Sequence, residues 1–481
     1  MMKDSPRRRR GHRAGAEFFS AVSLLLFSLF FAQIVDAHAQ ELPAGRVIER
    51  VVCKADQSQS YALFLPPGYA PDRKWPVIYC FDPGARGQMP VERFKDAAEK
   101  YGYIVVGSNN SRNGPGVPLD TIINTLWQDT HARLSIDDAR VHAAGFSGGA
   151  RVACAFGYMF NGRVAGVIAS GGGFPQNIRP SRATPFVLFG AAGVEDFNLI
   201  EMTRLAKTLN ENAIPNRLEV FEGRHEWLPV DSCMEAIEWM EIQAIRTGKR
   251  KSDEALVAAL LKKNLDEALS NESAGRVYQA YLIYEAAARD FKGLVDAGAA
   301  ETKAAQLRDS KEVRDGIKQE KEQDEKQVLR ARELFTLRQG LISSESRSLA
   351  LVDLKRAIGD LRKKAAEKER TTDQLVARRV LDMLFVQVYE EARALHYAKE
   401  YEMEAANLEI AAFVRPDNSR ILYSLAKAYS LDKDKRKAIE ALKRAVERGF
   451  KDAAEIERDK ELDSLRQEAD FKRIVEELKK T

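Results

Sequence analysis

Hydrophobic and polar positions divide the chain into two parts with different patterns. Between about residues 47 and 246, short runs that are almost wholly apolar alternate with amphipathic stretches. Apolar runs of this length are typical of strands that are buried on both faces of a mainly parallel sheet. We expect strands at residues 47–53, 61–66, 75–82, 103–110, 140–147, 163–172, 185–193 and 217–223.

The amphipathic stretches between these runs predict helices at residues 91–102, 119–134 and 197–214. Strands that alternate with helices in this way indicate an open α/β sheet. The first two strands have no helix between them, so they are expected to form an antiparallel hairpin at the edge of the sheet.

After about Thr247 the strand pattern stops. The rest of the chain is rich in Ala, Leu, Glu, Lys and Arg and has few Pro or Gly residues, which predicts helices over residues 252–480. Residues 309–335 are charged nearly all round, so this segment is either a long solvated helix or a flexible connector.

A repeat lies near the C-terminus and is clearest over residues 385–452. A shift of about 34 residues, the length of one tetratricopeptide repeat, brings Leu408 under Leu442, Ala411 under Ala445, and Pro416 to the place where a repeat usually ends. Small residues in this pattern mark the points where neighbouring helices approach most closely. The repeat positions, which resemble the tetratricopeptide pattern, are Leu422, Leu425, Ala426, Tyr429, Ala438, Leu442 and Ala445.

The N-terminus has the three parts of a secretory signal. A basic run at residues 7–13 is followed by an apolar run at residues 18–35 and by small residues at Ala37 and Ala39, which favours cleavage after Ala39. The alternative is an uncleaved membrane anchor, because the apolar run approaches the length that spans a bilayer. The predicted organisation is a signal peptide at 1–39, an α/β domain at 40–246, a linker at 247–255 and a helical domain at 256–480, in a periplasmic or secreted protein.

Charge gives no indication of a nucleic-acid partner. Loss of residues 1–39 removes six basic and three acidic residues, so the formal charge falls from +4 to +1. Nucleic-acid binding depends on clustered Lys and Arg side chains that neutralise phosphates, and a nearly neutral chain has no such excess.

Four cysteines leave two interpretations open. An exported chain meets oxidising conditions in which disulfides persist, and four thiols allow three pairings. Buried free thiols that behave as small apolar side chains are the alternative, because two of the cysteines lie inside apolar segments. The cysteines are Cys53, Cys80, Cys154 and Cys233.

The stretch at residues 140–151 changes from a strand pattern to a helix pattern around one serine. The residues Gly145 to Gly149 fit G-x-S-x-G, the nucleophile elbow, in which Ser147 occupies a strained turn with its hydroxyl exposed above a sheet. Glycines at the flanking positions avoid collisions in such a turn. The N-terminus of the following helix offers N–H groups that stabilise negative charge.

A serine nucleophile needs a base and an acid later in the chain, each after a strand. Of the histidines beyond residue 39, only His225 follows the last predicted strand, so it is the candidate base. For the acid, both Glu195 and Asp196 follow a strand, and an aspartate there could instead cap a helix. The other three histidines are expected to be satisfied core or surface residues; they are His131, His142 and His396.

Taken together, residues 45–246 resemble the α/β-hydrolase family, in particular its exported esterase, dienelactone-hydrolase-like and polyhydroxybutyrate-depolymerase-like branches. The resemblance depends on residues 61–87, the elbow, residues 190–198 and residues 223–227. It implies an α/β-hydrolase fold followed by an all-α, tetratricopeptide-like domain. It also implies that Asp196 is the acid, with Glu195 as the alternative.

The resemblance further implies an oxyanion hole made of backbone N–H groups. Gly148 would supply one, and the loop after the third strand would supply the other from Gly84, Ala85 or Arg86. Many relatives have a His-Gly pair in this loop, where this chain has Asp82 and Pro83. Arg86 could instead bind an anionic substrate group or be solvated, and the polar loop at residues 108–116 is expected to help shape the pocket.

We therefore expect an exported serine hydrolase that cleaves a carboxylic ester through an acyl-enzyme, with Ser147, His225 and Asp196 as its triad. The helical domain would bind a protein or peptide partner. One alternative is a non-catalytic scaffold that uses only the helical repeats, and another is a peptidase with the same triad. No motif indicates a metal, nucleotide or flavin, so no cofactor is expected.

Overall fold

The computed structural model describes residues 42–340 and 347–480. The predicted signal peptide or anchor at residues 1–39 lies outside this range. From Ala44 onwards the described residues form one compact unit. Within them, no helix combines the length and the apolar character needed to cross a bilayer.

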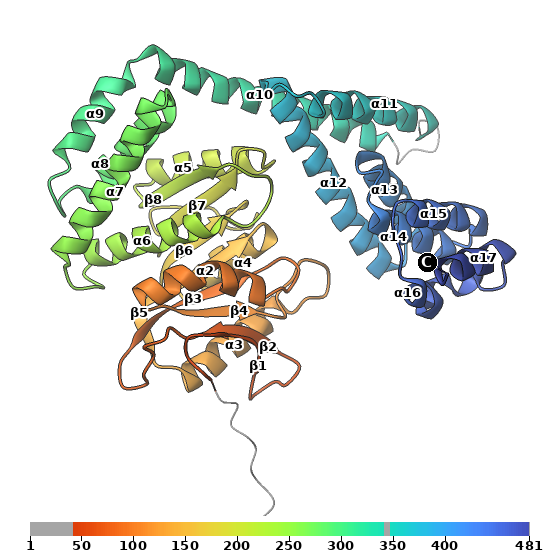
Figure 1. The fold of residues 1–481 in the computed structure, drawn as a ribbon, viewed down its shortest axis with the longest axis horizontal. Helices are drawn as coiled ribbons and strands as arrows, with labels where there is room; N and C mark the ends of the chain where they lie inside the picture. Colours follow the sequence, from red (N-terminus) through yellow and green to blue (C-terminus); the bar gives the residue numbers. More distant parts are fainter. Residues whose placement is uncertain (1–41, 341–346, 481) are drawn as a thin grey trace, which may run out of the picture. The chain divides into compact units, whose positions relative to one another are not determined.

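The N-terminal part of this unit is built on one sheet of eight strands (Figure 1). Their order is β1-β2-β4-β3-β5-β6-β7-β8; β2 pairs antiparallel with β1 and with β4, and all other pairs are parallel. The predicted mainly parallel α/β sheet and its antiparallel edge hairpin are thus confirmed. The strands are β1 (Val47–Val52), β2 (Ser60–Phe64), β3 (Trp75–Phe81), β4 (Ile104–Ser108), β5 (Ile136–Phe146), β6 (Val164–Ser170), β7 (Val187–Gly193) and β8 (Asn216–Phe221).

The strand that leads to Ser147 begins earlier than its apolar pattern indicates. β5 starts at Ile136, whereas the apolar run predicted a start at residue 140. After the buried Ile136, residues 137–140 are partly exposed and mostly polar, and Arg140 Nε donates to Asp137 Oδ2 at 2.8 Å. The pattern missed this part because only the later half of the strand is buried on both faces.

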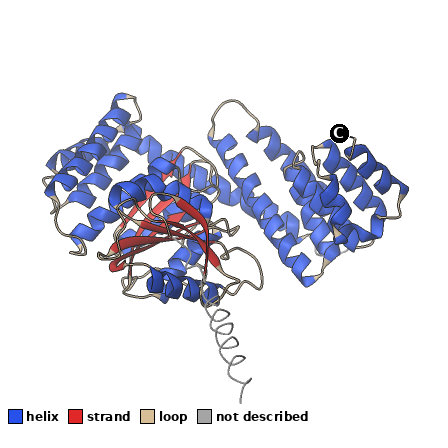
Figure 2. Ribbon diagram, turned by 60° about the horizontal axis from the view of Figure 1, so that its bottom comes forward, coloured by secondary structure: helices blue, strands red, loops and turns tan. Residues whose placement is uncertain are grey.

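Helices cover both faces of the sheet, as the alternation along β3 shows. Ile78 and Cys80 belong to the core beneath α2 and α6, whereas Tyr79 and Phe81 contact aromatic rings of α3 and α4. Figure 2 shows the red strands enclosed by helices. The helices of this part are α2 (Gln88–Tyr101), α3 (Leu119–Arg133), α4 (Gly148–Met159), α5 (Leu199–Glu211) and α6 (Val230–Arg246).

Beyond residue 253 the described chain is helical. Most of the charged segment at residues 309–335 lies in one long helix, α10, rather than in a flexible connector. The elements are α7 (Glu254–Ser273), α8 (Val277–Phe291), α9 (Gly298–Arg308), α10 (Lys311–Gln339), α11 (Arg347–Ala365), α12 (Thr372–Ala398), α13 (Tyr401–Val414), α14 (Ser419–Leu431), α15 (Lys435–Glu447), α16 (Ala453–Arg458), the 3₁₀ helix η1 (Lys460–Leu465) and α17 (Ala469–Leu478).

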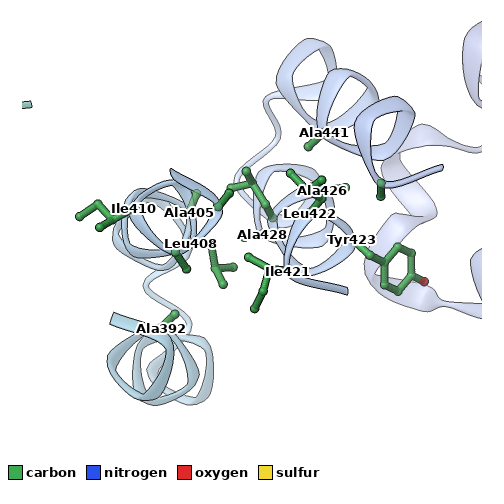
Figure 3. Packing of buried hydrophobic residues seen from close by; sticks show 14 of the residues in the cluster. Ala392, Ala405, Leu408, Ile410, Ile421, Leu422, Tyr423, Ala426, Ala428 and Ala441 are labelled. Carbon is green, nitrogen blue, oxygen red and sulfur yellow. The ribbon is translucent and has the colours of Figure 1, made fainter. Parts of the chain in front are cut away.

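The last helices share a core made of the repeat positions. Figure 3 shows Leu408 of α13 and Leu422 and Ala426 of α14 in this cluster. All seven repeat positions, together with Leu408 and Ala411, are buried. The small residues let consecutive helices pack closely, as the pattern requires; membership of the tetratricopeptide family stays a prediction.

Candidate active site

Ser147 lies on the turn between β5 and α4 in a strained backbone conformation. Its φ of 53° and ψ of −119° lie in a region that residues with a side chain rarely adopt. A Cβ on Gly145 would lie 2.0 Å from the carbonyl oxygen of Gly149, and one on Gly149 would lie 1.9 Å from that of Phe81. Because backbone atoms cannot move aside easily, glycine is required at both positions.

The structure brings Ser147, His225 and Asp196 together in one hydrogen-bonded chain. His225 Nε2 lies 2.9 Å from Ser147 Oγ, and His225 Nδ1 lies 2.9 Å from Asp196 Oδ1. A proton on Nδ1 would be donated to Asp196, which leaves Nε2 free to accept from the serine hydroxyl. Asp196 follows β7 and His225 follows β8, so both side chains reach the same edge of the sheet.

The carboxylate of Asp196 is fully buried and held in place. Oδ1 also accepts the backbone N–H of Asn198 at 2.7 Å, whereas Oδ2 has no hydrogen-bond partner in the described part of the chain. Gly171 has a φ of +56°, and a Cβ there would lie 2.8 Å from Asp196 Oδ2 and 3.1 Å from His225 Nδ1. A larger residue at position 171 would therefore press on both groups.

Two aromatic rings fix the imidazole of His225. The ring centroids of Phe146 and Phe197 lie 4.6 and 4.2 Å from that of His225. Phe146 immediately precedes Ser147, and Phe197 follows Asp196. The chain segments that carry Ser147 and Asp196 therefore also restrict the ring of His225. His225 keeps a side-chain exposure of 11%, which leaves one edge accessible.

Glu195, the alternative acid, is engaged elsewhere. Its carboxylate accepts from Arg378 Nη1 at 2.6 Å and from Arg224 Nε at 3.2 Å. The geometry therefore favours Asp196 as the residue that orients His225.

The predicted oxyanion donors differ in their present partners. Gly148 is the first residue of α4, and the geometry of a helix leaves its N–H without a partner inside the helix. The loop candidates all donate to Asp82: Gly84 N at 2.8 Å and Arg86 N at 3.4 Å to Oδ1, and Ala85 N at 3.1 Å to the carbonyl oxygen. Of these four predicted donors, only Gly148 has a backbone N–H that is not committed to its own loop or helix.

Asp82 connects the loop after β3 to the loop that carries His225. Its buried carboxylate accepts from Arg86 Nε at 2.8 Å and Nη2 at 2.9 Å, and from Trp227 Nε1 at 2.8 Å. Burial alone would raise the pKa of Asp82, but the hydrogen bonds from Arg86, Trp227 and Gly84 lower it. The Arg86 guanidinium is thus paired with Asp82, which disfavours the prediction that it binds an anionic substrate, but its side chain remains 59% exposed to solvent.

Asn113, in the polar loop at residues 108–116, lies against the elbow. A Cβ on Gly148 would lie only 1.9 Å from Asn113 Oδ1. The backbone N–H of Asn113 donates to Pro83 O at 2.9 Å, and its Nδ2 donates to Glu390 Oε1 on α12 at 2.5 Å. The sequence placed this loop near the pocket but did not single out Asn113.

Helices α10 and α12 also reach the loop that carries Asp196. Gln327 Nε2 donates to Phe197 O at 2.8 Å, and Arg379 donates to Val194 O from Nε at 3.0 Å and from Nη2 at 2.5 Å. Arg370, in the segment just before α12, pairs with Glu222, which follows β8. Sequence reasoning missed these contacts because they join segments that are more than a hundred residues apart.

The remaining histidines and the cysteines lie away from this arrangement. His131 contacts Trp127, His142 is buried in β5, and His396 pairs with Glu404 and Glu461 on other helices. All four cysteines are free and buried, so the disulfide interpretation does not hold in this structure. Across residues 42–340 and 347–480, no group of three or more His, Cys, Asp or Glu side chains could hold a metal ion.

Comparisons with known proteins find only distant likenesses. No protein-family model matches the chain, and no curated protein matches it. The chain is similar to a ferulic acid esterase, with 18% identity over 40% of this chain and 96% of that chain and a TM-score of 0.36. It is also similar to an S-formylglutathione hydrolase from Staphylococcus aureus, with 13% identity over 42% and 99% of the two chains and a TM-score of 0.34.

A third similar structure is a ferulic acid esterase from the anaerobic fungus Anaeromyces mucronatus, with 18% identity over 42% of this chain and 91% of that chain and a TM-score of 0.31. All three likenesses are confined to less than half of this chain. The function proposed below therefore rests on the geometry of Ser147, His225 and Asp196.

Proposed function

We propose that the protein is a serine hydrolase that cleaves carboxylic esters through an acyl-enzyme. The observation that carries this proposal is the continuous chain of hydrogen bonds from Ser147 Oγ through His225 to the buried Asp196. A hydroxyl, an imidazole and a carboxylate in this order are the parts that activate a serine for attack on a carbonyl.

In the proposed reaction, His225 Nε2 takes the proton of Ser147 as Oγ attacks the ester carbonyl. The N–H of Gly148 stabilises the oxyanion of the tetrahedral intermediate, helped by the N-terminus of α4. The protonated imidazole then donates to the leaving alcohol. Water repeats the sequence on the acyl-enzyme and releases the carboxylic acid.

The second oxyanion donor would come from Gly84, Ala85 or Arg86 in the loop after β3. Each of these N–H groups now donates to Asp82, so one of them must exchange this partner for the substrate oxygen. The mainly parallel sheet, the strained serine and the position of this loop after β3 together support membership of the α/β-hydrolase family.

The decisive test is the removal of the serine hydroxyl. Ser147→Ala is expected to lower kcat for a short-chain aryl ester by about 10³-fold or more, because the nucleophile is lost. Labelling by a fluorophosphonate probe should also disappear. The control is Ser252→Ala, at an exposed serine between α6 and α7, which should be labelled like the parent protein.

Equal labelling or equal turnover in Ser147→Ala and the parent protein would refute the proposal. It would favour the hypothesis of a non-catalytic scaffold. Asp196→Asn and Glu195→Gln test the acid: the first should lose most activity and the second should retain it. Comparing ester with peptide substrates distinguishes an esterase from a peptidase.

We also propose that the chain is exported and that the helical part binds a protein or peptide. The basic, apolar and small-residue segments at residues 1–39 support export. Cell fractionation, with N-terminal sequencing of the mature protein, tests cleavage after Ala39. A full-length chain retained in the membrane would instead support the anchor alternative.

A further inference from the structure

A cavity of about 410 Å³ lies where the loop at residues 112–117 meets helices α12, α13 and α14. The loop contributes Arg112 and Asn113, and α12 contributes Tyr389, Arg393 and Tyr397. Both parts of the molecule therefore form its wall. Its volume is in the range of sites that hold small molecules.

The acidic residues of this cavity already have partners. His396 lies 3.0 Å from Glu404 and 3.2 Å from Glu461, and Lys427 lies 3.0 Å from Glu461. Glu390, beside the cavity, accepts from Asn113. A positively charged ligand would thus find no free carboxylate here.

Two arginines of the cavity, unlike its acidic residues, have no side-chain partner among the described residues. Arg112 and Arg393 are exposed, and neither guanidinium has a hydrogen-bond or ion-pair partner among the described residues. Arg393 extends towards the loop of Arg112, because a Cβ on Gly114 would lie 3.6 Å from Arg393 Nη2. Arginines and lysines exceed carboxylates by one in the lining, so the cavity has a net charge of about +1 that suits a single carboxylate better than a dianionic phosphate.

One residue joins this cavity to the proposed nucleophile. Asn113 lines the cavity, and its carboxamide lies against Gly148, the residue after Ser147. Arg112 forms a backbone bridge with Gly84 of the loop after β3. An extended molecule with its ester at Ser147 could therefore place a second group in the cavity.

From this arrangement we infer that the preferred substrate is an ester that also carries a free carboxylate, and that Arg112 and Arg393 bind this carboxylate. The inference rests on the proposed ester hydrolysis and names its substrate class. Guanidinium groups match the planar geometry of a carboxylate and form charge-assisted hydrogen bonds with it. Hydrolysis breaks the acyl C–O bond at Ser147, adds water to the acyl group and leaves the remote carboxylate unchanged.

The test compares two series of 4-nitrophenyl esters. One contains the monoesters of glutarate, adipate and suberate, and the other contains the neutral pentanoate, hexanoate and octanoate of matched length. In the parent protein, kcat/KM should be higher for the anionic ester at one or more lengths, and added salt should reduce the difference. Arg393→Gln and Arg112→Gln should each lower the anionic-to-neutral ratio about tenfold, the size expected for a lost charge-assisted hydrogen bond.

Arg314→Gln is the matched control, because Arg314 is an exposed arginine of α10 that does not line the cavity. Its ratio should equal that of the parent protein. Two outcomes would overturn the inference and leave the proposed hydrolase intact. The parent protein could show no preference for the anionic esters, or the anionic-to-neutral ratio could stay unchanged in both Arg112→Gln and Arg393→Gln.

Absence of turnover in both series would instead refute the proposed function. The binding arm then decides the inference separately: adipate is titrated calorimetrically into Ser147→Ala and into the same protein with Arg393→Gln. Binding that weakens about tenfold or more without Arg393 supports the carboxylate site. Equal binding, or no binding to either protein, contradicts it.

Discussion

His142 is a titratable residue of the strand that leads to Ser147, and its imidazole is buried without a partner. Neither ring nitrogen has a hydrogen-bond partner in the described part of the chain. Burial, together with the charges of Arg140 and Lys249, lowers the pKa of His142 to about 3. The folded protein therefore keeps this histidine neutral at pH values where an unfolded chain, with a histidine pKa of about 6.5, is protonated.

This difference predicts a loss of stability in mild acid. Above about pH 6.5 neither state binds the proton, but as the pH falls from there towards 3 only the unfolded state does. Between pH 7 and pH 5 the penalty from this one residue is about 2 kcal/mol. His142→Leu removes the group, so its free energy of unfolding should fall less over this range.

Urea denaturation of both proteins at the two pH values measures the effect. Replacing a buried unpaired polar side chain with an apolar one should also leave the stability at pH 7 unchanged or raise it by about 1 kcal/mol. Parallel losses in the parent protein and in His142→Leu would show that His142 is not the residue responsible.

At the scale of elements, helix α12 fixes the loop that follows β7. Arg379 is 1% exposed, and burial is the first of the causes that lower the pKa of its guanidinium. No carboxylate in the described chain lies within ion-pair distance of it. Two of its hydrogen bonds go to the carbonyl oxygen of Val194, two residues before Asp196, and a third goes to Gln323 Oε1 of α10 at 3.2 Å. The bonds to Val194 make Arg379 a candidate positioning residue.

Arg379→Met should therefore impair the proposed site more than the fold. The substitution leaves the Val194 carbonyl without its two donors, which costs about 1–3 kcal/mol and lets the Asp196 loop shift. We expect the rate of fluorophosphonate labelling and kcat to fall about tenfold, with KM little changed, since a small misplacement of reacting groups has effects of this size.

The control is Arg356→Met on α11, where the arginine is exposed and pairs with Asp353 of the same helix at 2.9 Å. It should label at the parent rate. Circular dichroism of the same samples measures the unfolded fraction. If the activity of Arg379→Met falls only in proportion to this fraction, Arg379 has a structural role alone.

The sequence could indicate Ser147, Asp196 and His225 because a local pattern identifies each of them. Glycines flank the serine, and the other two residues follow apolar strands whose carboxyl ends meet at one edge of the sheet. The partners of the loop after β3 could not be predicted in this way. Asp82 accepts from Gly84 within its own loop and from the distant Trp227, and this choice depends on tertiary packing.

The same reason explains why Arg379, Arg393 and Glu390 escaped the sequence analysis. All three lie on one charged and amphipathic helix, where an arginine or a glutamate is ordinarily a solvated residue. Only the packing of α12 against loops of the sheet, which no local pattern records, distinguishes these residues from their neighbours.

At the scale of the whole molecule, the last helix of the α/β part shares an apolar cluster with the first helices of the helical part. Residues Ile242 and Ile245 of α6 belong to one apolar cluster with α7 and α8, and Trp239 Nε1 donates to Asp290 Oδ2 of α8 at 3.0 Å. Arg250, within the predicted linker, pairs with Glu241 of α6. The short segment between α6 and α7 is therefore part of a continuous packed structure.

A chain that ends at residue 252 should accordingly be less stable than the full protein. Truncation exposes Trp239, Ile242 and Ile245, and each large apolar side chain left in water costs about 1.5–3 kcal/mol. The sum of about 4.5–9 kcal/mol should lower Tm by roughly 10–35 °C. Truncation should also expose a surface prone to aggregation. The truncated chain also lacks Arg379 and Gln327, so it should label slowly with a fluorophosphonate even where it remains folded.

Differential scanning calorimetry of both chains provides the comparison. A truncated protein with the Tm and labelling rate of the full chain would mean that the helices are an independent appendage, contrary to the shared core described above.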